Sequence, residues 1–368
     1  QTYSGAVTLG ADTTLTTGVS GGAIAFTSTL DGGFSLSTTT TGATTFGGTV
    51  GASALTGLTI STGTLTGHAI TLVTGGALSI TETGDGTLDG VIAGIGVTLT
   101  KAGAGALTLG GVSNNTYSGG TTLSGGTLKA GSSNQAFGTG AVVEASAGGV
   151  VIDLNGKTIS NALTLYSAAS PTVYALTDSA GSGVQQTGVV TLGSNVLMGL
   201  ATGKTMTVSG EIADTHGYTL TINKTGDTGT VILSGANSYT GATTVNAGTL
   251  ALSGNGTLGN TSSLLTISSA TLDLRRSLTV GSLSLSGTSP SITNSTGSSS
   301  LLVNGTSTLS GSITTSGAQT YTGAVTLGAD TTLTTTDSLV SFGSTVGNSA
   351  AKALTISSGT GGVTFTGA

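Results

Sequence analysis

Short segments in which apolar residues alternate with threonine or serine recur along the whole chain. They include Val-Thr-Leu at 7–9, Leu-Thr-Ile at 58–60, Leu-Thr-Leu at 107–109 and Leu-Ser-Leu-Ser at 283–286. Apolar residues at positions i and i+2 with a polar residue between them indicate a β-strand that buries one face. Glycine-rich stretches separate these segments, as is typical of turns. The pattern predicts an all-β protein with almost no helix.

The sequence also repeats itself over a long distance. Residues 1–17 and 319–335 differ at one position, and the similarity resumes between 46–61 and 342–357 at a different offset. The offset between the two copies falls from 318 to 296. The second copy therefore lacks a stretch of sequence between its two preserved segments, and the length of that stretch equals the difference between the two offsets. A solenoid tolerates such a loss because each coil contacts only its neighbours. The repeat therefore predicts a solenoid with coils of roughly 20–25 residues.

Together these patterns predict a right-handed, single-stranded parallel β-helix that runs as one continuous domain over residues 1–368, with the sequence restarting at 319. Strand segments spaced by about 8–12 residues would also suit a sandwich or barrel, but the uniform texture marks no boundary between such domains. We expect Leu, Val and Ile inside and Thr outside. We also expect no interior Asp, Glu, Lys or Arg, and little room for aromatic side chains.

Two segments resemble a known repeat. Residues 107–128 read LTLGGVSNNTYSGGTTLSGGTL and residues 231–250 read VILSGANSYTGATTVNAGTL. They are similar to the autotransporter-associated β-strand repeat, and the opening of the chain resembles repeats of haemagglutinin-like bacterial surface proteins. The matching positions are Tyr117, Gly119, Gly126, Tyr239, Gly241 and Gly248. The resemblance implies secretion, a right-handed β-helix and an extracellular or cell-surface location, and it carries over no catalytic residues.

Composition agrees with an exported repeat protein. Serine and threonine form about a third of the chain, and 65 of 368 residues are glycine. Cysteine is absent, and neither a signal peptide nor a membrane barrel with aromatic girdles is visible in the sequence. No apolar run reaches the length of a membrane helix, so we expect no membrane insertion within this segment.

The chain has few charged residues that could take part in catalysis or ligand binding. The chain carries 14 acidic and 8 basic residues, a net charge of −6, which argues against a nucleic-acid partner. The densest acidic cluster, Glu82, Asp85 and Asp89, is a weak calcium candidate whose spacing matches no known calcium loop. We expect no cofactor. Arg275 and Arg276 fit a solvated turn after Asp273 better than an anion site.

Three functions remain open. The first is a structural segment of a long extracellular fibre, sheath or stalk, which would partner itself by head-to-tail stacking or by covalent continuation of the array. The second is an adhesin passenger that binds cell-surface glycans or neighbouring cells. Residues 161–186, with Tyr166, Pro171 and Tyr174, are the best candidate for its binding loop. The third, a glycan-active enzyme, needs carboxylates gathered on one face, which the sequence does not indicate.

Overall fold

A computed structural model describes residues 1–18, 21–145, 149–167, 172–181, 183–348 and 350–367. In these residues the chain forms 42 β-strands and no helix. Two compact units are distinguished, one comprising Gln1–Ala180 with Val184–Val189, the other Gly181–Gly183 with Val190–Ala368. Each unit is a parallel β-solenoid, so the predicted fold class is confirmed. That the two units form one continuous β-helix stays a prediction.

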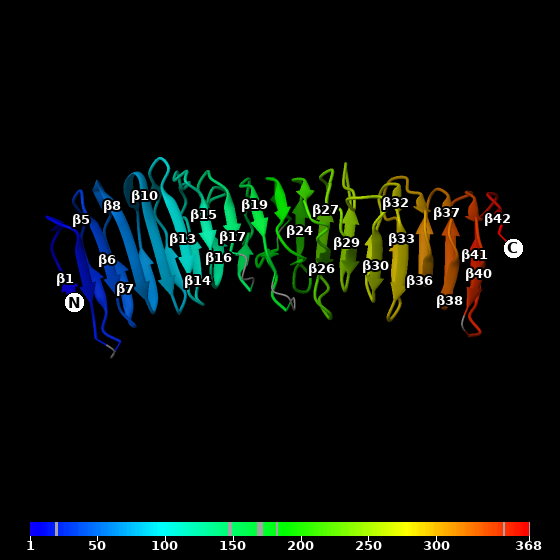
Figure 1. The fold of residues 1–368 in the computed structure, drawn as a ribbon, viewed down its shortest axis with the longest axis horizontal. Helices are drawn as coiled ribbons and strands as arrows, with labels where there is room; N and C mark the ends of the chain where they lie inside the picture. The colour runs from blue at the N-terminus through cyan, green and yellow to red at the C-terminus, as the bar shows by residue number, and fades with distance from the viewer. Residues whose placement is uncertain (19–20, 146–148, 168–171, 182, 349, 368) are drawn as a thin grey trace. The chain divides into compact units, whose positions relative to one another are not determined.

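The strands of the first unit stack in parallel ladders (Figure 1). One ladder contains β1 (Thr2–Tyr3), β4 (Ile24–Phe26), β7 (Ala43–Phe46), β9 (Thr64–Gly67), β11 (Gly86–Leu88), β14 (Ala106–Leu109), β16 (Thr127–Ala130), β18 (Val151–Asp153) and β20 (Leu176–Thr177). A second contains β2 (Val7–Thr8), β5 (Leu30–Asp31), β8 (Val50–Thr62), β10 (Ile70–Glu82), β13 (Thr98–Ala102), β15 (Thr121–Leu123), β17 (Val142–Glu144) and β19 (Leu163–Leu165). Further strands are β3 (Thr13–Thr16), β6 (Ser35–Thr39), β12 (Ile92–Ala93) and β21 (Val184–Gln186).

The second unit has three main ladders of the same kind. The first contains β23 (Val196–Met198), β26 (Leu220–Ile222), β28 (Thr243–Val245), β30 (Leu264–Ser268), β33 (Ser282–Ser286), β36 (Ser307–Thr315), β38 (Val325–Thr335) and β40 (Val346–Asn348). The second contains β24 (Thr205–Val208), β27 (Thr230–Leu233), β29 (Thr249–Leu252), β31 (Thr271–Asp273), β34 (Ser291–Thr293) and β41 (Leu354–Ser357), joined through β36 and β38. The third contains β32 (Leu278–Val280), β35 (Leu301–Val303), β37 (Gln319–Tyr321), β39 (Val340–Phe342) and β42 (Val363–Phe365), and β22 (Val190–Leu192) pairs with β25 (Ile212–Ala213).

Strand registers give the coil length directly, because paired residues are equivalent positions of successive coils. Gly86 pairs with Leu107, and Val196 pairs with Leu220. Both separations lie within the coil length predicted from the repeat. Shorter coils also occur, since Ser268 pairs with Ser286 across a sequence separation of 18. The predicted coil length therefore holds for most coils.

Alternate strand residues fill the interior, as the pattern predicts. In β14 the side chains of Leu107 and Leu109 are fully buried, whereas Thr108 is part-exposed. Aromatic residues are nevertheless interior, contrary to the expectation that they fit poorly. Phe26 stacks between Tyr3 and Phe46 with ring centroids 4.9 and 5.5 Å apart. A solenoid can hold them because parallel register places ring over ring in successive coils.

The same stack identifies the stretch that one repeat lacks. In the second unit Tyr321 stacks directly on Phe342 at 5.4 Å, and Phe342 is the sequence equivalent of Phe46. The coil that carries Phe26 in the first unit has no counterpart between them. The change of offset between the two repeats thus corresponds to one whole coil.

Candidate functional site

The positions that carry the sequence resemblance form two matching clusters, one in each unit. Tyr117 and Tyr239 are fully buried, each just before a strand, β15 and β28 respectively. Their hydroxyl groups share a hydrogen bond with Thr121 at 2.7 Å and with Thr243 at 2.6 Å. Burial raises the pKa of both tyrosines, so both stay neutral hydrogen-bond partners inside the coil.

An asparagine two positions before each tyrosine ties three coils together. Asn115 Oδ1 accepts the N–H of Ile92 at 2.7 Å, and its amide nitrogen donates to the carbonyl of Ala136 at 2.5 Å. Asn237 does the same with Ile212 at 2.8 Å and Thr257 at 2.7 Å. Sequence reasoning missed both asparagines. Their equal spacing from the two tyrosines is the signal that could have found them.

The glycines of the motif allow neighbouring coils to approach closely. A Cβ atom on Gly119 or on Gly241 would lie under 3.0 Å from a backbone carbonyl oxygen of the preceding coil. Such a distance is well inside van der Waals contact, so a larger residue would force the coils apart. Gly126 and Gly248 have left-handed φ angles of 68° and 61°, which favour glycine.

Aspartates make a second set of contacts between coils. At least eight of the chain's aspartates accept a backbone N–H from a residue in the next coil. The pairs are Asp12 with Ser35, Asp31 with Ser53, Asp85 with Ala106, Asp153 with Ser179, Asp214 with Thr240, Asp273 with Ser295, Asp330 with Ala353 and Asp337 with Thr360. We call these contacts the aspartate staples. Most acidic residues of the chain therefore hold coils together.

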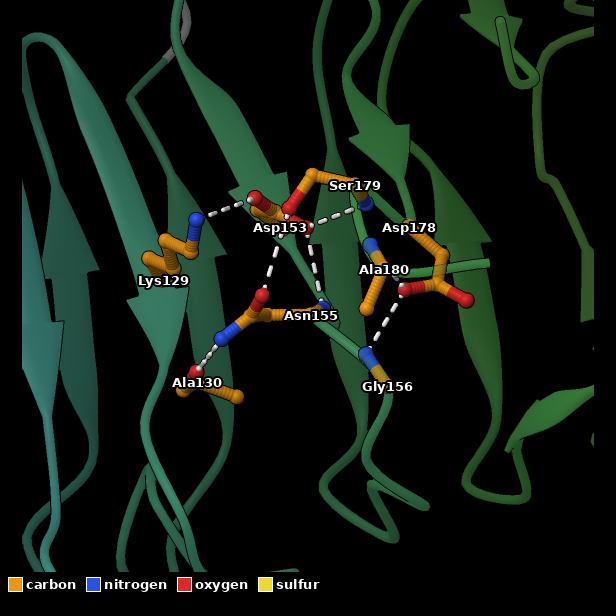
Figure 2. Close-up of polar contacts among 8 residues, drawn as sticks. All are labelled: Lys129, Ala130, Asp153, Asn155, Gly156, Asp178, Ser179 and Ala180. Atoms are coloured by element: carbon orange, nitrogen blue, oxygen red, sulfur yellow. Dashed lines mark hydrogen bonds and ion pairs between the residues drawn. The ribbon is translucent and has the colours of Figure 1, made fainter. Parts of the chain in front are cut away.

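Figure 2 shows one of these staples in detail. Asp153 Oδ1 accepts the N–H groups of Asn155 and Ser179, while its other oxygen lies 3.8 Å from the Lys129 ammonium. Asp178, in the next coil, accepts the N–H groups of Gly156 and Ala180 at 2.7 and 3.2 Å. The two turns are thus fastened in both directions.

Asp273 repeats the arrangement in the second unit. It accepts the N–H of Ser295 at 2.9 Å, and Arg275 Nε donates to it at 2.6 Å. Burial raises the pKa of Asp273, but the hydrogen bonds from Ser295 and Arg275 outweigh burial and hold it below its usual value. Arg276 donates to the carbonyl of Gly254. The arginine pair therefore lies in a turn, as its sequence suggests.

The prediction of a charge-free interior is wrong. Glu82 and Lys101 are both fully buried, with Lys101 Nζ 3.8 Å from Glu82 Oε1. The ammonium also donates to the carbonyls of Ala102, Gly103 and Gly125 at 2.8, 3.1 and 3.2 Å. The carbonyl of Ala102 lies at the end of β13 and those of Gly103 and Gly125 lie in turns, and together they compensate the cost of burying the charge. Burial raises the pKa of Glu82 to about 7, against the opposing effect of Lys101.

A second buried acid, Glu144, has no cation within ion-pair distance among the described residues. It lies at the end of β17, is fully buried and accepts the N–H of Tyr166 at 2.6 Å. Burial raises the pKa of Glu144 to about 9, although the Tyr166 hydrogen bond opposes the shift. The side chain is therefore a neutral carboxylic acid at pH 7. Asp153, Asp178 and Asp273 are also at most 5% exposed, so buried acids are a recurrent feature of the interior and its rim.

The calcium candidates point to different partners. Glu82 faces the interior toward Lys101, Asp85 accepts the N–H of Ala106, and Asp89 pairs with the ring of His68 at 2.5 Å. Within the described ranges, no three His, Cys, Asp or Glu side chains gather where they could hold a metal ion. The placement of these three residues thus lends the calcium hypothesis no support.

The candidate binding loop is only partly described. Pro171 lies outside the described residues. Tyr174 is buried, with 8% of its surface exposed, and Tyr166 is half-buried. Neither ring stands out as an exposed platform for a sugar. In the part of the chain that the structure describes, no helix is long and apolar enough to cross a membrane.

Comparison with known proteins places both tyrosine clusters in one family. The model of the passenger-associated transport repeat matches residues 99–130 and 222–252, which include all six positions of the sequence resemblance. Two segments of the chain are therefore similar to passenger repeats. A segment of 182 residues, 48% of this chain, is 36% identical to the adhesin BmaC autotransporter of Brucella suis biovar 1, of which it covers 4%. No solved structure matches the chain.

In these passenger repeats, the shared asparagines and tyrosines serve the stacking of coils. Asn115 and Asn237 hydrogen-bond across three coils, and Tyr117 and Tyr239 fill the interior. The two repeats therefore share a set of buried contacts that stack one coil on the next.

Proposed function

We propose that this chain is a non-enzymatic, surface-displayed passenger segment that works as a stiff spacer within an autotransporter adhesin. The observation that carries the proposal is the burial of the repeat residues. Tyr117 and Tyr239 have no exposed surface, and Asn115 is likewise fully buried, so the repeated chemistry is directed at neighbouring coils. Side chains used for holding a ligand would have to reach solvent.

The backbone supports the same function. Strands of each unit pair in parallel through many coils, and aspartate staples add a side-chain bond between successive turns. Within each unit such a structure resists bending, because backbone and side-chain hydrogen bonds join successive coils. The passenger repeats and the adhesin relative support an extracellular location.

A spacer and a ligand-binding adhesin make different predictions for the isolated chain. Beads coated with the purified chain should be retained on epithelial cells and on a glycan array no more than albumin-coated beads. Displayed between an outer-membrane anchor and a terminal epitope, the chain should expose the epitope to antibody-coated particles that cannot reach it when one unit is deleted. Saturable binding to a glycan class would contradict the spacer and favour an adhesin domain.

The alternative, an adhesin surface within this chain, rests on the name of the BmaC relative. It would require exposed groups for contact, and among the described residues the strongly exposed large apolar side chains include Val112 and Ile95. The glycan array described above measures directly whether this chain binds glycans.

A further inference from the structure

Asparagine is followed directly by glycine at Asn155–Gly156, Asn255–Gly256 and Asn304–Gly305. Such a step can react with itself, because glycine has no side chain to keep its nitrogen away from the preceding side-chain amide. The glycine nitrogen loses its proton to solvent and attacks the asparagine Cγ, the Cγ–Nδ2 bond breaks, ammonia leaves, and a succinimide ring closes. Water then opens the ring to aspartate or isoaspartate. Sequence alone does not distinguish the three steps.

The structure holds the side-chain amide of Asn155 at both of its polar atoms (Figure 2). The amide nitrogen donates to the carbonyl of Ala130 in the preceding coil at 2.7 Å. The amide oxygen accepts the hydroxyl of Ser179 in the following coil at 3.3 Å. Both hydrogen bonds have to break before Cγ can turn toward the nitrogen of Gly156.

The backbone of the same turn is also fixed. Asn155 and Gly156 have φ angles of 45° and 77°, as in a tight two-residue turn. The N–H of Lys157 closes the turn by donating to the carbonyl of Leu154 at 2.9 Å, and the N–H of Gly156 donates to Asp178 at 2.7 Å. Rotation of the peptide between Asn155 and Gly156 toward ring closure breaks both of these hydrogen bonds.

Asn255 and Asn304 are held by fewer contacts. Both are exposed, and neither has a positive φ angle. Among the described residues, neither side chain makes a hydrogen bond. The N–H of Gly256 and that of Gly305 each donate to one backbone carbonyl, at 2.8 and 2.5 Å. Ring closure at either site therefore has one backbone hydrogen bond to break.

We propose that Asn255 and Asn304 are sites of spontaneous modification, where the folded chain converts asparagine to aspartate and isoaspartate, and that the contacts around Asn155 keep the third step unreactive. Three more hydrogen bonds oppose the reaction at Asn155 than at either of the other sites. A net hydrogen bond is equivalent to roughly fivefold in an equilibrium constant, so the reaction at Asn155 should be slower by about 100-fold.

Modification changes the coil in which it occurs. Isoaspartate carries the main chain through its side-chain carbon, so it lengthens the backbone by a methylene group, and it adds a negative charge. At Asn304 this displaces the N–H of Gly305, which bonds the carbonyl of Gly281 in the preceding coil. Contacts between these two coils should therefore weaken as the protein ages, whereas the turn at Asn155 should persist.

The test incubates the purified full chain at mildly alkaline pH in water enriched in heavy oxygen, which labels each newly formed carboxyl group. After return to ordinary water, a chymotryptic digest and peptide fragmentation give the labelled fraction at all three asparagines of the same molecule. The chain unfolded in guanidinium chloride is the reference, because without structure the three steps should react at similar rates.

Two variants test the source of the protection. Asp153→Ala removes the carboxylate that accepts the N–H groups of Asn155 and Ser179. The matched control is Asp31→Ala, which removes the aspartate staple to Ser53, elsewhere in the first unit. Asp153→Ala should speed labelling at Asn155 by about tenfold and leave the other two sites unchanged, and the control should change none of the three rates.

In the folded parent chain, Asn255 and Asn304 should label within about tenfold of their rates in the unfolded chain, and Asn155 should label about 100-fold more slowly than either. Equal labelling at the three sites of the folded chain would overturn the proposal. So would a folded chain that labels at none of them while the unfolded chain reacts. If Asp153→Ala leaves Asn155 unreactive, the contacts around Asn155 are not what protects it. None of these outcomes depends on whether the chain is a spacer or an adhesin.

Discussion

The neutral carboxyl group of Glu144 makes a quantitative prediction about pH. Its pKa is raised from an ordinary 4.5 to about 9 because the side chain is buried, with the Tyr166 N–H as its one described hydrogen-bond donor. The folded chain thus keeps a proton that the unfolded chain releases above pH 4.5. The stabilising effect is complete below pH 4.5 and is lost as the pH rises toward 9.

The magnitude follows from the size of this shift. One unit of pKa difference corresponds to about 1.36 kcal/mol, so ionisation of Glu144 lowers the free energy of unfolding by about 6 kcal/mol between pH 4.5 and 9 as an upper limit. Glu144→Gln removes the titration and keeps an oxygen that can accept the Tyr166 N–H. The stability difference between the variant and the parent should therefore change by roughly 1 kcal/mol per pH unit above about pH 5.5, in favour of the variant.

Urea unfolding followed by far-ultraviolet circular dichroism, at half-unit steps from pH 5 to 8.5, measures this difference. The matched control is Glu211→Gln, since Glu211 is exposed and accepts a hydrogen bond from Ser238. The control reports how replacing an exposed glutamate by its amide changes stability under the same conditions. A difference for Glu144→Gln that stays flat across this range would refute the idea that the group is buried and protonated.

Three further outcomes test the contacts between coils. Lys101→Met should destabilise the chain by about 3–5 kcal/mol because Glu82 is left buried without its cation, and adding Glu82→Gln should recover most of the loss in the same urea titration. Gly119→Ala should lower stability by about 1–3 kcal/mol, whereas Gly5→Ala, where no atom lies within 4 Å of the new Cβ, should change the melting temperature little. The lowered pKa of Asp273 stabilises the fold at every pH above 3.8, the ordinary pKa of the group, and this contribution is lost as the pH falls through the lowered pKa. Asp273→Asn should therefore be less stable than the parent at neutral pH. In thermal melts near pH 2 the two proteins should have the same stability.

The fold could be predicted from sequence because its determinants are local and repeated. The alternation seen in Leu107, Thr108 and Leu109 fixes which face of a strand is buried, and the change of offset between the two repeats fixes the coil. The positions Tyr117 and Tyr239 could be found for the same reason, since each sits in a copy of one motif. Repetition turns a weak local pattern into a reliable one.

The buried charges could not be predicted, because burial of a charged group depends on partners from other coils. The ammonium group of Lys101 donates to the carbonyls of Gly103 and Gly125. Nothing in the sequence distinguishes these two glycines from the others, because only the stacking of the coils brings them to Lys101. The role of Asp12 was hidden in the same way, since its partner Ser35 lies in the next coil. Aromatic stacking of the kind seen between successive coils likewise depends on register, which composition does not reveal.

The stack of Tyr321 on Phe342 has a consequence for how such proteins change through evolution. Without the coil that carries Phe26 in the first unit, the second unit still makes a ring-on-ring contact of 5.4 Å, close to the 4.9 Å between Tyr3 and Phe26. Recombination between repeats can therefore excise or insert one coil and still restore a complete interior. Length then becomes a heritable trait adjustable in steps of about 4.8 Å, the spacing of neighbouring strands, without selection having to redesign a core at each step.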